Sequence, residues 1–386
     1  MKKTIMLALL PMLWLFTSCP NADAPATDEP APEELRGIWL TNVDSRVLDS
    51  RESIRAAMQF LADHHFNAVF PVVWNDAVTL FPSQVMDSLF GLPIDPRYAG
   101  RDPLQEVIEE AHQRGIAVIP WFEYGFAASY QKNGGDILKA KPHWAAADSR
   151  GGLLTKNGFE WMNGYHAEVQ QFLLSLVKEV ASHYDVDGVQ GDDRLPAQPI
   201  EGGYSAHTDS LFRAEHNGAA PPDDFRDPAW QRWRADRLSQ FAHRLYAEVN
   251  ALKSNLIISW APSIYPWCYD EYLQDWPAWL QNGDADIVIP QCYRYNLADY
   301  KSTVNTLIPA ELATQPGDKI IFPGILMNVG DYTISEELLM QKLAYNREKG
   351  YCGEVFFFYE GLRKNDDALS KKLLESYYHQ KATLPF

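Results

Sequence analysis

The run Asp187-Gly188-Val189-Gln190-Gly191-Asp192-Asp193-Arg194 decides the expected fold. Its first part has the composition of a short buried strand, and two carboxylates follow where that strand should end. The preceding segment, Glu168–His183, carries apolar residues at helical spacing. A helix that leads into such a strand is the repeating unit of a parallel α/β fold.

The same unit recurs along the chain from Leu35 onward, and glycines such as Gly115 and Gly350 mark helix ends before strands. We expect eight strands, at Leu35–Val43, Asn67–Trp74, Ile116–Tyr124, Asp187–Asp192, Leu256–Pro262, Asp286–Tyr293, Lys319–Leu326 and Glu354–Glu360. The clearest helices are Ser53–His64, Pro103–Arg114, Glu168–His183, Ala229–Leu252 and Ser335–Lys349. Eight units without a hinge-like linker favour a closed (β/α)8 barrel over an open doubly wound sheet.

Composition limits the classes of protein that this chain can represent. A length of 386 residues suits one large barrel domain, and 46% hydrophobic residues supply its core. The net charge of −17 disfavours nucleic acid as a partner, because phosphates would be repelled. We find no dinucleotide or P-loop motif and no spacing typical of metal ligands, and therefore expect no metal and no cofactor.

The N-terminus is expected to direct export. Residues 1–18 combine two lysines with a short apolar run, which is typical of a signal peptide. The run ends just before Cys19, the candidate for lipidation, although an ordinary secretory peptide with a chance cysteine is the alternative. Residues 19–34 are rich in Pro, Ala, Asp and Glu and are expected to form a flexible tether. The barrel would then occupy residues 35–386 of a membrane-anchored lipoprotein of the bacterial cell envelope, periplasmic or at the cell surface.

Acidic side chains stand at the ends of several predicted strands, where barrel enzymes place their active sites. The candidates for catalysis are Asp192, Asp193, Glu123 and Glu360. Strand alternation predicts that Asp192 and Asp193 point to opposite sides, so that only one faces the cleft. The alternatives are that an aspartate caps a helix, or that a glutamate forms a structural ion pair with Arg36 or Arg294.

Polar and aromatic residues at the same strand ends are candidates for substrate binding. They are Asn42, Trp74, Asn75, Trp121, Tyr124, Trp260, Gln291, Tyr293, Arg294 and Tyr359. Long loops that follow the strands, at Glu123–Tyr165 and Tyr265–Trp279, are rich in Trp, Tyr and Phe. Aromatic faces suit the C–H faces of pyranose rings, so we expect aromatic-rich loops at the carboxyl ends of the strands to bind sugar.

Several of these runs together resemble the glycosyl-hydrolase-like 10 family. The similar stretches are Leu35–Leu40, Ile119–Gly125, Tyr184–Asp193, Tyr272–Trp276 and Pro290–Arg294. The resemblance extends to about Leu362. It implies a barrel glycosidase of the cell envelope, with bacterial cell-wall glycan strands as a plausible substrate. It also matches the Asp192–Asp193 pair to the family's acidic motif and Glu123 to its third-strand position.

We therefore expect a glycoside hydrolase that cleaves O-glycosidic bonds in a polysaccharide, possibly peptidoglycan glycan strands. Asp192 would be the nucleophile or base, and Glu123 or Glu360 the proton donor. The alternative is a carbohydrate-binding lipoprotein with a barrel cleft and little or no catalysis. Two carboxyl groups about 5–5.5 Å or about 6.5–9.5 Å apart would favour the retaining or the inverting enzyme, respectively.

Overall fold

The computed structural model describes residues 30–386, and Pro32–Phe386 form one compact unit. The predicted signal peptide and Cys19 lie outside the described residues, as does most of the predicted tether. The barrel strands are β1 Leu35–Leu40, β2 Ala68–Pro71, β5 Ala117–Val118, β6 Trp121–Phe122, β10 Gly188–Asp192, β11 Ile257–Ala261, β12 Ile287–Val288, β13 Gly324–Leu326 and β16 Gly353–Phe357. The pair β5 and β6 occupies a single wall position.

These strands close into a parallel barrel. One sheet has the order β13-β16-β1-β2-β5 and the other β12-β11-β10-β6, with registers such as Gly37 opposite Ala68 and Gly188 opposite Ile257. Parallel bridges join the two sheets on both sides, between Val72 and Trp121 and between Val288 and Ile321. The predicted (β/α)8 fold is therefore confirmed.

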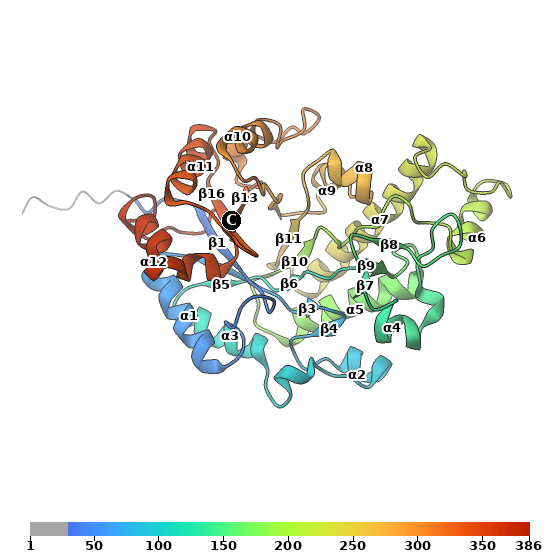
Figure 1. Ribbon diagram of the computed structural model, residues 1–386, viewed down its shortest axis with the longest axis horizontal. Coiled ribbons are helices and arrows are strands. Elements are labelled where there is room, and N and C mark those ends of the chain that lie inside the picture. Colours follow the sequence, from blue (N-terminus) through green and yellow to red (C-terminus); the bar gives the residue numbers. More distant parts are fainter. Residues whose placement is uncertain (1–29) are drawn as a thin grey trace, which may run out of the picture. The chain divides into compact units, whose positions relative to one another are not determined.

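A helix follows each wall position and covers the outside of the barrel (Figure 1). These helices are α1 Arg51–Asp63, α3 Pro103–His112, α5 Ala167–His183, α7 Pro228–Leu252, α9 Trp276–Asn282, α10 Leu297–Asn305, α11 Glu336–Glu348 and α12 Tyr359–Glu375. Short helical turns lie at Pro96–Tyr98, Pro142–Trp144 and Pro316–Asp318. In the part of the chain that the structure describes, no helix is long and apolar enough to cross a membrane.

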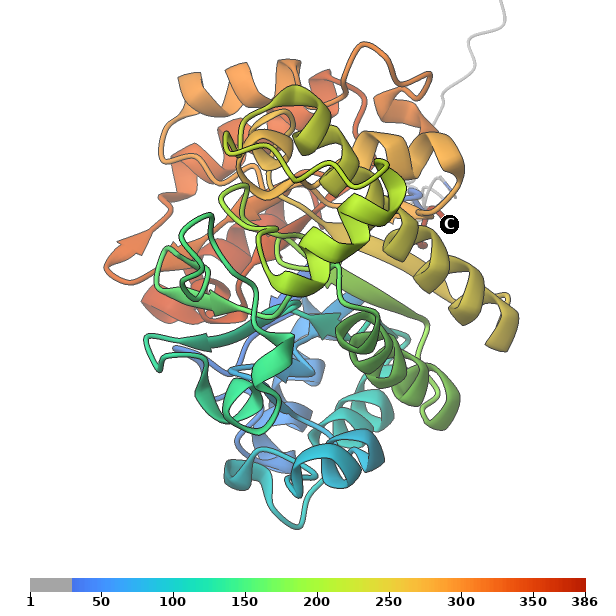
Figure 2. The same ribbon diagram turned by 90° about the vertical axis from the view of Figure 1, so that its right-hand side faces the viewer.

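The loops at the carboxyl ends of the strands contain structure that the sequence did not predict. Their elements are the hairpin β3 Trp74–Asn75 and β4 Val78–Thr79, α2 Gln84–Phe90, β7 Ala127–Tyr130, α4 Gly135–Ala140, β8 Thr155–Lys156, β9 Phe159–Trp161, α6 Ala206–Glu215, α8 Trp267–Tyr272, and the hairpin β14 Asn328–Val329 and β15 Tyr332–Thr333. The segments after β6 and β10 stack together and cover one side of the barrel, as Figure 2 shows from their outer side.

The last strand is shorter than expected. We predicted a strand over Glu354–Glu360, but β16 ends at Phe357 and α12 begins at Tyr359. Glu360 therefore lies in the first turn of a helix and not at a strand end. A run of aromatic residues is compatible with either structure, which is why the sequence pattern did not locate the boundary.

A polar bridge crosses the inside of the barrel. The indole Nε1 of Trp39 on β1 donates to Gln190 Oε1 on β10 at 2.7 Å, and Gln190 Nε2 donates to Ser259 Oγ on β11 at 2.8 Å. All three side chains are buried, so each hydrogen bond satisfies a group that water cannot reach. The bridge ties one strand of the first sheet to two strands of the second.

Replacing Gln190 with leucine should destabilise the barrel. The change keeps the volume but leaves the Trp39 indole and the Ser259 hydroxyl buried without their partners, which costs about 2 kcal/mol of unfolding free energy. Denaturant unfolding measures the loss. The exposed Gln113, changed in the same way, is the control and should alter stability by less than about 0.5 kcal/mol. Equal stability of the two variants would contradict the role of the bridge.

Candidate active site

One guanidinium gathers three of the predicted catalytic carboxylates. Arg194 Nη2 lies 3.4 Å from Glu123 Oε1 and 3.4 Å from Asp192 Oδ2, and Arg194 Nη1 lies 3.1 Å from Asp193 Oδ1. Arg194 Nε also donates to the backbone carbonyl of Glu123 at 3.1 Å. The side chain of Asp192 is almost fully buried, whereas those of Arg194 and Asp193 are 16% and 27% exposed. The ends of β6 and β10 are thus held together by charge.

The end of β10 explains how both aspartates reach the same arginine. We predicted that strand alternation would send them to opposite sides, and this is wrong because β10 ends at Asp192 and the chain turns at once. The turn approaches the barrel closely: a Cβ atom on Gly191 would lie 2.4 Å from the Trp260 ring and 2.6 Å from the carbonyl oxygen of Leu195. Glycine is therefore required immediately before the pair.

Asp192 is further oriented from β11 and β12. Gln291 Nε2 donates to Asp192 Oδ1 at 2.9 Å and to the carbonyl of Ala261 at 3.0 Å. Gln274 Nε2 donates to the backbone carbonyl of Asp192 at 2.8 Å. Both oxygens of the Asp192 carboxylate thus face donors, from Gln291 and from Arg194, and these favour its charged form.

The pKa of each of the two most buried acids is raised. Burial raises the pKa of Glu123 to about 7, against the lowering effect of Arg194. Burial raises the pKa of Asp192 well above its ordinary value as well, and the neighbouring charge of Asp193 adds to this. Glu123 Oε2 is buried and has no hydrogen-bond partner among residues 30–386. Glu123 can therefore hold a proton near neutral pH and present it to a ligand.

Aromatic rings form the floor beneath these acids. The Trp121 ring lies 6.2 Å from Trp39 and 6.3 Å from Phe357, and Phe357 lies 5.4 Å from Tyr293. Burial raises the pKa of Tyr293, with further contributions from the negative charges of Asp192, Asp193 and Glu123. Trp121 Nε1 is buried and has no hydrogen-bond partner within the described chain.

Two further predicted groups lie on the neighbouring strand ends. Asn75 Nδ2 donates to Asn42 Oδ1 at 2.9 Å, and both are buried. Tyr124 OH faces Asp76 Oδ1 at 3.5 Å, and Asp76 forms an ion pair with Lys132 at 2.7 Å. These contacts place polar side chains from the loops after β1, β2 and β6 close to one another.

Three predicted binding residues serve packing instead. The Trp74 ring packs 5.7 Å from Phe172 of α5, and the Trp260 ring packs 5.2 Å from Trp279 of α9, so both face the outer helices. Tyr359 packs edge-on at 6.1 Å against Phe60 of α1. Their predicted role as sugar-binding residues of the cleft is therefore not supported by their positions.

Within residues 30–386, neither Glu360 nor Arg294 forms a hydrogen bond or an ion pair with the acids around Arg194. Glu360 Oε1 accepts from Ser45 Oγ at 2.7 Å, and the side chain lines a cavity of about 540 Å³ with Asp44, Asn328 and Arg363 among others. Arg294 Nη1 donates to the carbonyl of Tyr293 at 2.9 Å. Of the two candidate proton donors, Glu123 is the one that shares an arginine with the aspartates.

Residues that sequence reasoning missed hold the site together. Arg194 follows the acidic pair directly, and an arginine next to two buried aspartates is a signal that could have been used. Phe159, whose ring lies 4.7 Å from the Arg194 guanidinium, comes from β9 and carried no comparable signal. Gln274 lies between two short helices, and its contact with β10 depends on the fold of that loop.

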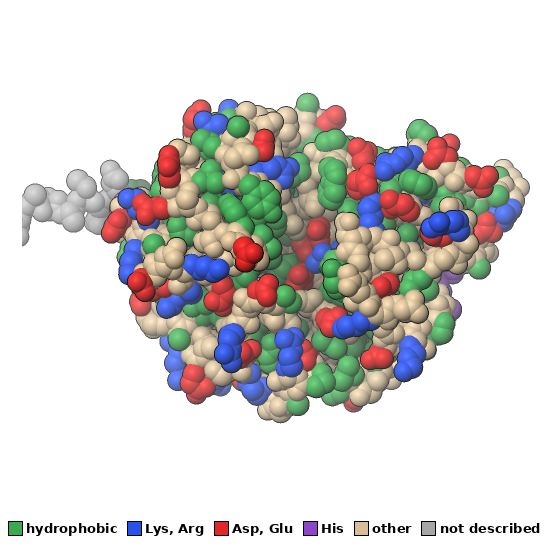
Figure 3. Space-filling view, viewed as in Figure 1, with side chains coloured by type: hydrophobic (Ala, Val, Ile, Leu, Met, Phe, Trp, Pro, Cys, Tyr) green, Lys and Arg blue, Asp and Glu red, His purple; other side chains and the backbone are tan. Residues whose placement is uncertain are grey.

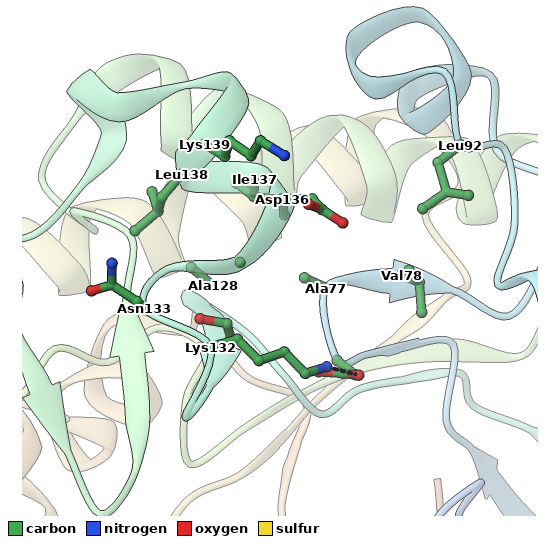
Figure 4. Close-up of a pocket in the computed structure, with 13 residues that line it drawn as sticks. Ala77, Val78, Leu92, Ala128, Lys132, Asn133, Asp136, Ile137, Leu138 and Lys139 are labelled. Atoms are coloured by element: carbon green, nitrogen blue, oxygen red, sulfur yellow. Dashed lines mark hydrogen bonds and ion pairs between the residues drawn. The ribbon is translucent and has the colours of Figure 1, made fainter.

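The cleft is visible on the molecular surface. Figure 3 shows a hollow between the loops after β6 to β11 and the region of α10 to α12, with charged side chains of both signs inside it. A separate cavity of about 620 Å³ lies between α4 and the β3–β4 hairpin. In Figure 4 Lys132 reaches along it to Asp76, while Val78 and Leu92 face it from the other side.

An eight-stranded parallel barrel with acids gathered at the carboxyl ends of its strands is an architecture that glycoside hydrolases share with many other barrel enzymes. The chain belongs to the glycosyl hydrolase-like 10 family, whose profile matches residues 34–327. It is 27% identical over 321 residues to glycosyl hydrolase DigH of Escherichia coli strain K12, covering 72% of this chain and 70% of that protein. It is 24% identical to glycosyl hydrolase YngK of Bacillus subtilis, covering 69% and 56%.

Solved structures support the same fold. The PgaB (BpsB) glycoside hydrolase domain from Bordetella bronchiseptica aligns with a TM-score of 0.63 at 14% identity, over 89% of this chain and 99% of that domain. Alpha-L-fucosidase isoenzyme 2 from Paenibacillus thiaminolyticus aligns with a TM-score of 0.64 at 16% identity, over 90% of this chain and 49% of that one. At these identities the likeness establishes the fold alone.

The raised pKa of Glu123 predicts a pH-dependent gain of stability in Glu123→Gln. The native carboxyl contributes stability fully below its unfolded pKa of about 4.5 and loses it as pH rises through about 7. The glutamine amide does not ionise, so the unfolding free energy of the variant should rise by up to about 3 kcal/mol relative to the native chain between pH 5 and pH 8. Thermal unfolding across that range measures the gain.

Glu168→Gln is the control with the opposite sign. Hydrogen bonds from His143 and Trp144 lower the pKa of Glu168 to about 2, so its charged form stabilises the fold above that value. Its amide variant should be less stable than the native chain at neutral pH, with the difference shrinking as pH falls toward about 2. If Glu123→Gln became less stable than the native protein as pH increased, the native Glu123 carboxyl would be ionised and paired in the folded state.

Proposed function

We propose that this protein is a glycoside hydrolase that cleaves O-glycosidic bonds in a polysaccharide by two-carboxylate chemistry. The observation that carries the proposal is that Glu123 and Asp192 share Arg194 while differing in their other partners. Asp192 accepts from donors on both oxygens, which fix the orientation of its carboxyl group and oppose the effect of burial on its charged form. Glu123 has one buried oxygen without a partner in the described structure, which suits a proton donor.

The separation of the two acids favours a direct nucleophile. Because Glu123 Oε1 and Asp192 Oδ2 each lie 3.4 Å from the same nitrogen, they can be no more than twice that distance apart. This limit accommodates the separation of about 5–5.5 Å that retaining enzymes use and excludes most of the range of inverting enzymes. It supports catalysis over binding alone, because a binding cleft has no need of two acids at this spacing.

The proposed reaction has two steps. Asp192 attacks the anomeric carbon while the Glu123 carboxyl gives its proton to the departing glycosidic oxygen, so a glycosyl ester forms as the old bond breaks. Water then attacks the same anomeric carbon, Glu123 takes a proton from the water, and Asp192 leaves as a carboxylate. Arg194 keeps both acids in place through each step.

Glycan strands of the bacterial cell wall are the substrate class that we propose. The similarity to glycosyl hydrolases DigH and YngK supports the hydrolase class. The expected export of the chain would bring it to the compartment where such strands lie. The proposal therefore depends on two independent properties, the chemistry of the cleft and the expected export of the chain.

Asp192→Asn and Glu123→Gln should each lower turnover of peptide-stripped peptidoglycan strands by about 10²–10⁴-fold, because each removes one acid–base or nucleophilic partner. Mass spectrometry of released oligosaccharides measures this, with intact peptidoglycan and neutral glucans compared in parallel. Glu360→Gln is the matched control and should retain turnover. Full activity of Asp192→Asn, or loss in Glu360→Gln alone, would contradict the assignment. Retained strand binding with no product in the native protein would instead favour a carbohydrate-binding protein.

We further propose that the mature chain is a membrane-anchored lipoprotein held through Cys19. Residues 1–18 support this as a signal peptide, and the stretch 19–34 as a tether that leads to β1. Cys19→Ala should abolish incorporation of labelled palmitate and shift the protein from the membrane to the soluble fraction. Cys352→Ala, which changes a partly exposed cysteine of the barrel, should leave both unchanged. Palmitate incorporation that survives Cys19→Ala would contradict the anchor.

A further inference from the structure

The exposed Tyr and Trp side chains gather on one face of the barrel. In residues 30–386 the exposed Tyr and Trp side chains are Tyr295, Trp267 and Tyr130, at 61%, 51% and 45% exposure. All three lie in loops that follow barrel strands at their carboxyl ends, after β12, β11 and β6. Single exposed apolar residues need no explanation, but their restriction to the face that holds the acids indicates a shared ligand.

Each of these rings is held in place by a second ring. Tyr295 packs edge-on against Tyr332 of β15 at 4.8 Å, Trp267 lies 5.5 Å from Tyr272, and Tyr130 lies 5.1 Å from Phe159 of β9. A Cβ atom on Gly158 would come within 2.5 Å of the Tyr130 ring, so glycine at this position leaves the space that the ring occupies. Rings fixed in this way lose little entropy when a ligand covers their open face.

The second rings connect the exposed ones to the acids. Phe159 contacts the Arg194 guanidinium at 4.7 Å. Burial and then the charge of Asp193 raise the pKa of Tyr272 to about 12, which reflects its position near that carboxylate. Tyr295 is two residues beyond Tyr293 of the aromatic floor. The exposed rings thus stand on loops of three different strands, β6, β11 and β12, which belong to the same sheet as β10.

Resting on the proposed function, we propose that Tyr130, Trp267 and Tyr295 are outer sugar-binding subsites of an extended glycan strand. Flat aromatic faces bury the C–H faces of pyranose rings. A strand long enough to reach these rings should therefore bind more tightly than a single disaccharide.

The test separates binding from cleavage. Glycan strands stripped of peptides are fractionated by length, from a single disaccharide to long strands. Their dissociation constants are measured by isothermal titration calorimetry in the full-length Glu123→Gln protein, which should not cut them. Trp267→Ala and Tyr295→Ala, added to that background, should each weaken the binding of long strands on the order of tenfold and leave the disaccharide unchanged. Phe386→Ala, which removes an exposed aromatic outside the cleft loops, is the control.

The outcomes distinguish this inference from the proposed function. Equal losses for short and long strands, or no loss for either, would overturn the outer subsites even if the native enzyme cleaves glycans. Length-dependent losses would support them even if no cleavage is detected, which would overturn the hydrolase proposal alone. If no strand binds at any length, both proposals fail.

Discussion

The contact of Arg194 with three carboxylates is the constraint on which the rest of the site depends. Taking charges out of water is costly, and two of these acids are buried over an aromatic floor. One guanidinium partly offsets three negative charges, so the cluster stays electrostatically unsatisfied. Burial, opposed by the charge of Arg194 and assisted by that of Asp193, keeps the pKa of Glu123 high enough for a proton to be available near neutral pH.

The barrel supplies what this cluster requires. Glu123 and the aspartates come from neighbouring strands, and parallel strands bring their carboxyl ends to one face. The tight turn at Gly191 then lets Asp192, Asp193 and Arg194 follow one another without leaving that face. Beneath them, Trp121 and Phe357 exclude water from the interior. The topology of the barrel determines where the three acids meet, and the packing of side chains around them determines their dielectric environment.

The sequence predicted the parts of the fold and site that follow from periodicity. The eight wall positions, the Asp192–Asp193 pair and Glu123 were located correctly because apolar runs ending in acids are visible without knowing the structure. Gln291 and Tyr293 were also correctly placed, since they follow the sixth strand. The predicted ends lie within two residues of those of β6 and β10, whereas β12 ends at Val288, five residues before the predicted end at Tyr293.

The remainder could not be predicted because it depends on side-chain direction and on long-range packing. Trp260 lies on β11, where a shift of one residue moves a side chain from the barrel interior to the helix layer, whereas Trp74 lies beyond β2 in the β3–β4 hairpin and faces α5. Glu360 and Tyr359 were misplaced because the last strand ends earlier than its aromatic run. Alternation does not hold for Asp192 and Asp193 because Asp193 already lies in the turn after β10.

Aromatic residues have two distinct uses in this molecule, and composition alone does not separate them. Trp144, Trp161, Trp276 and Trp279 in the long loops are buried and pack those loops onto the barrel. Tyr130 and Trp267 belong to the same loops and Tyr295 to the loop after β12, but all three remain open to solvent. The buried group makes the loops rigid, and only rigid loops can hold the exposed group at fixed positions around the cleft. Burial of the first set of rings thus offsets the conformational entropy that the long loops lose on folding. The exposed rings can then form a surface that is already ordered before a ligand binds.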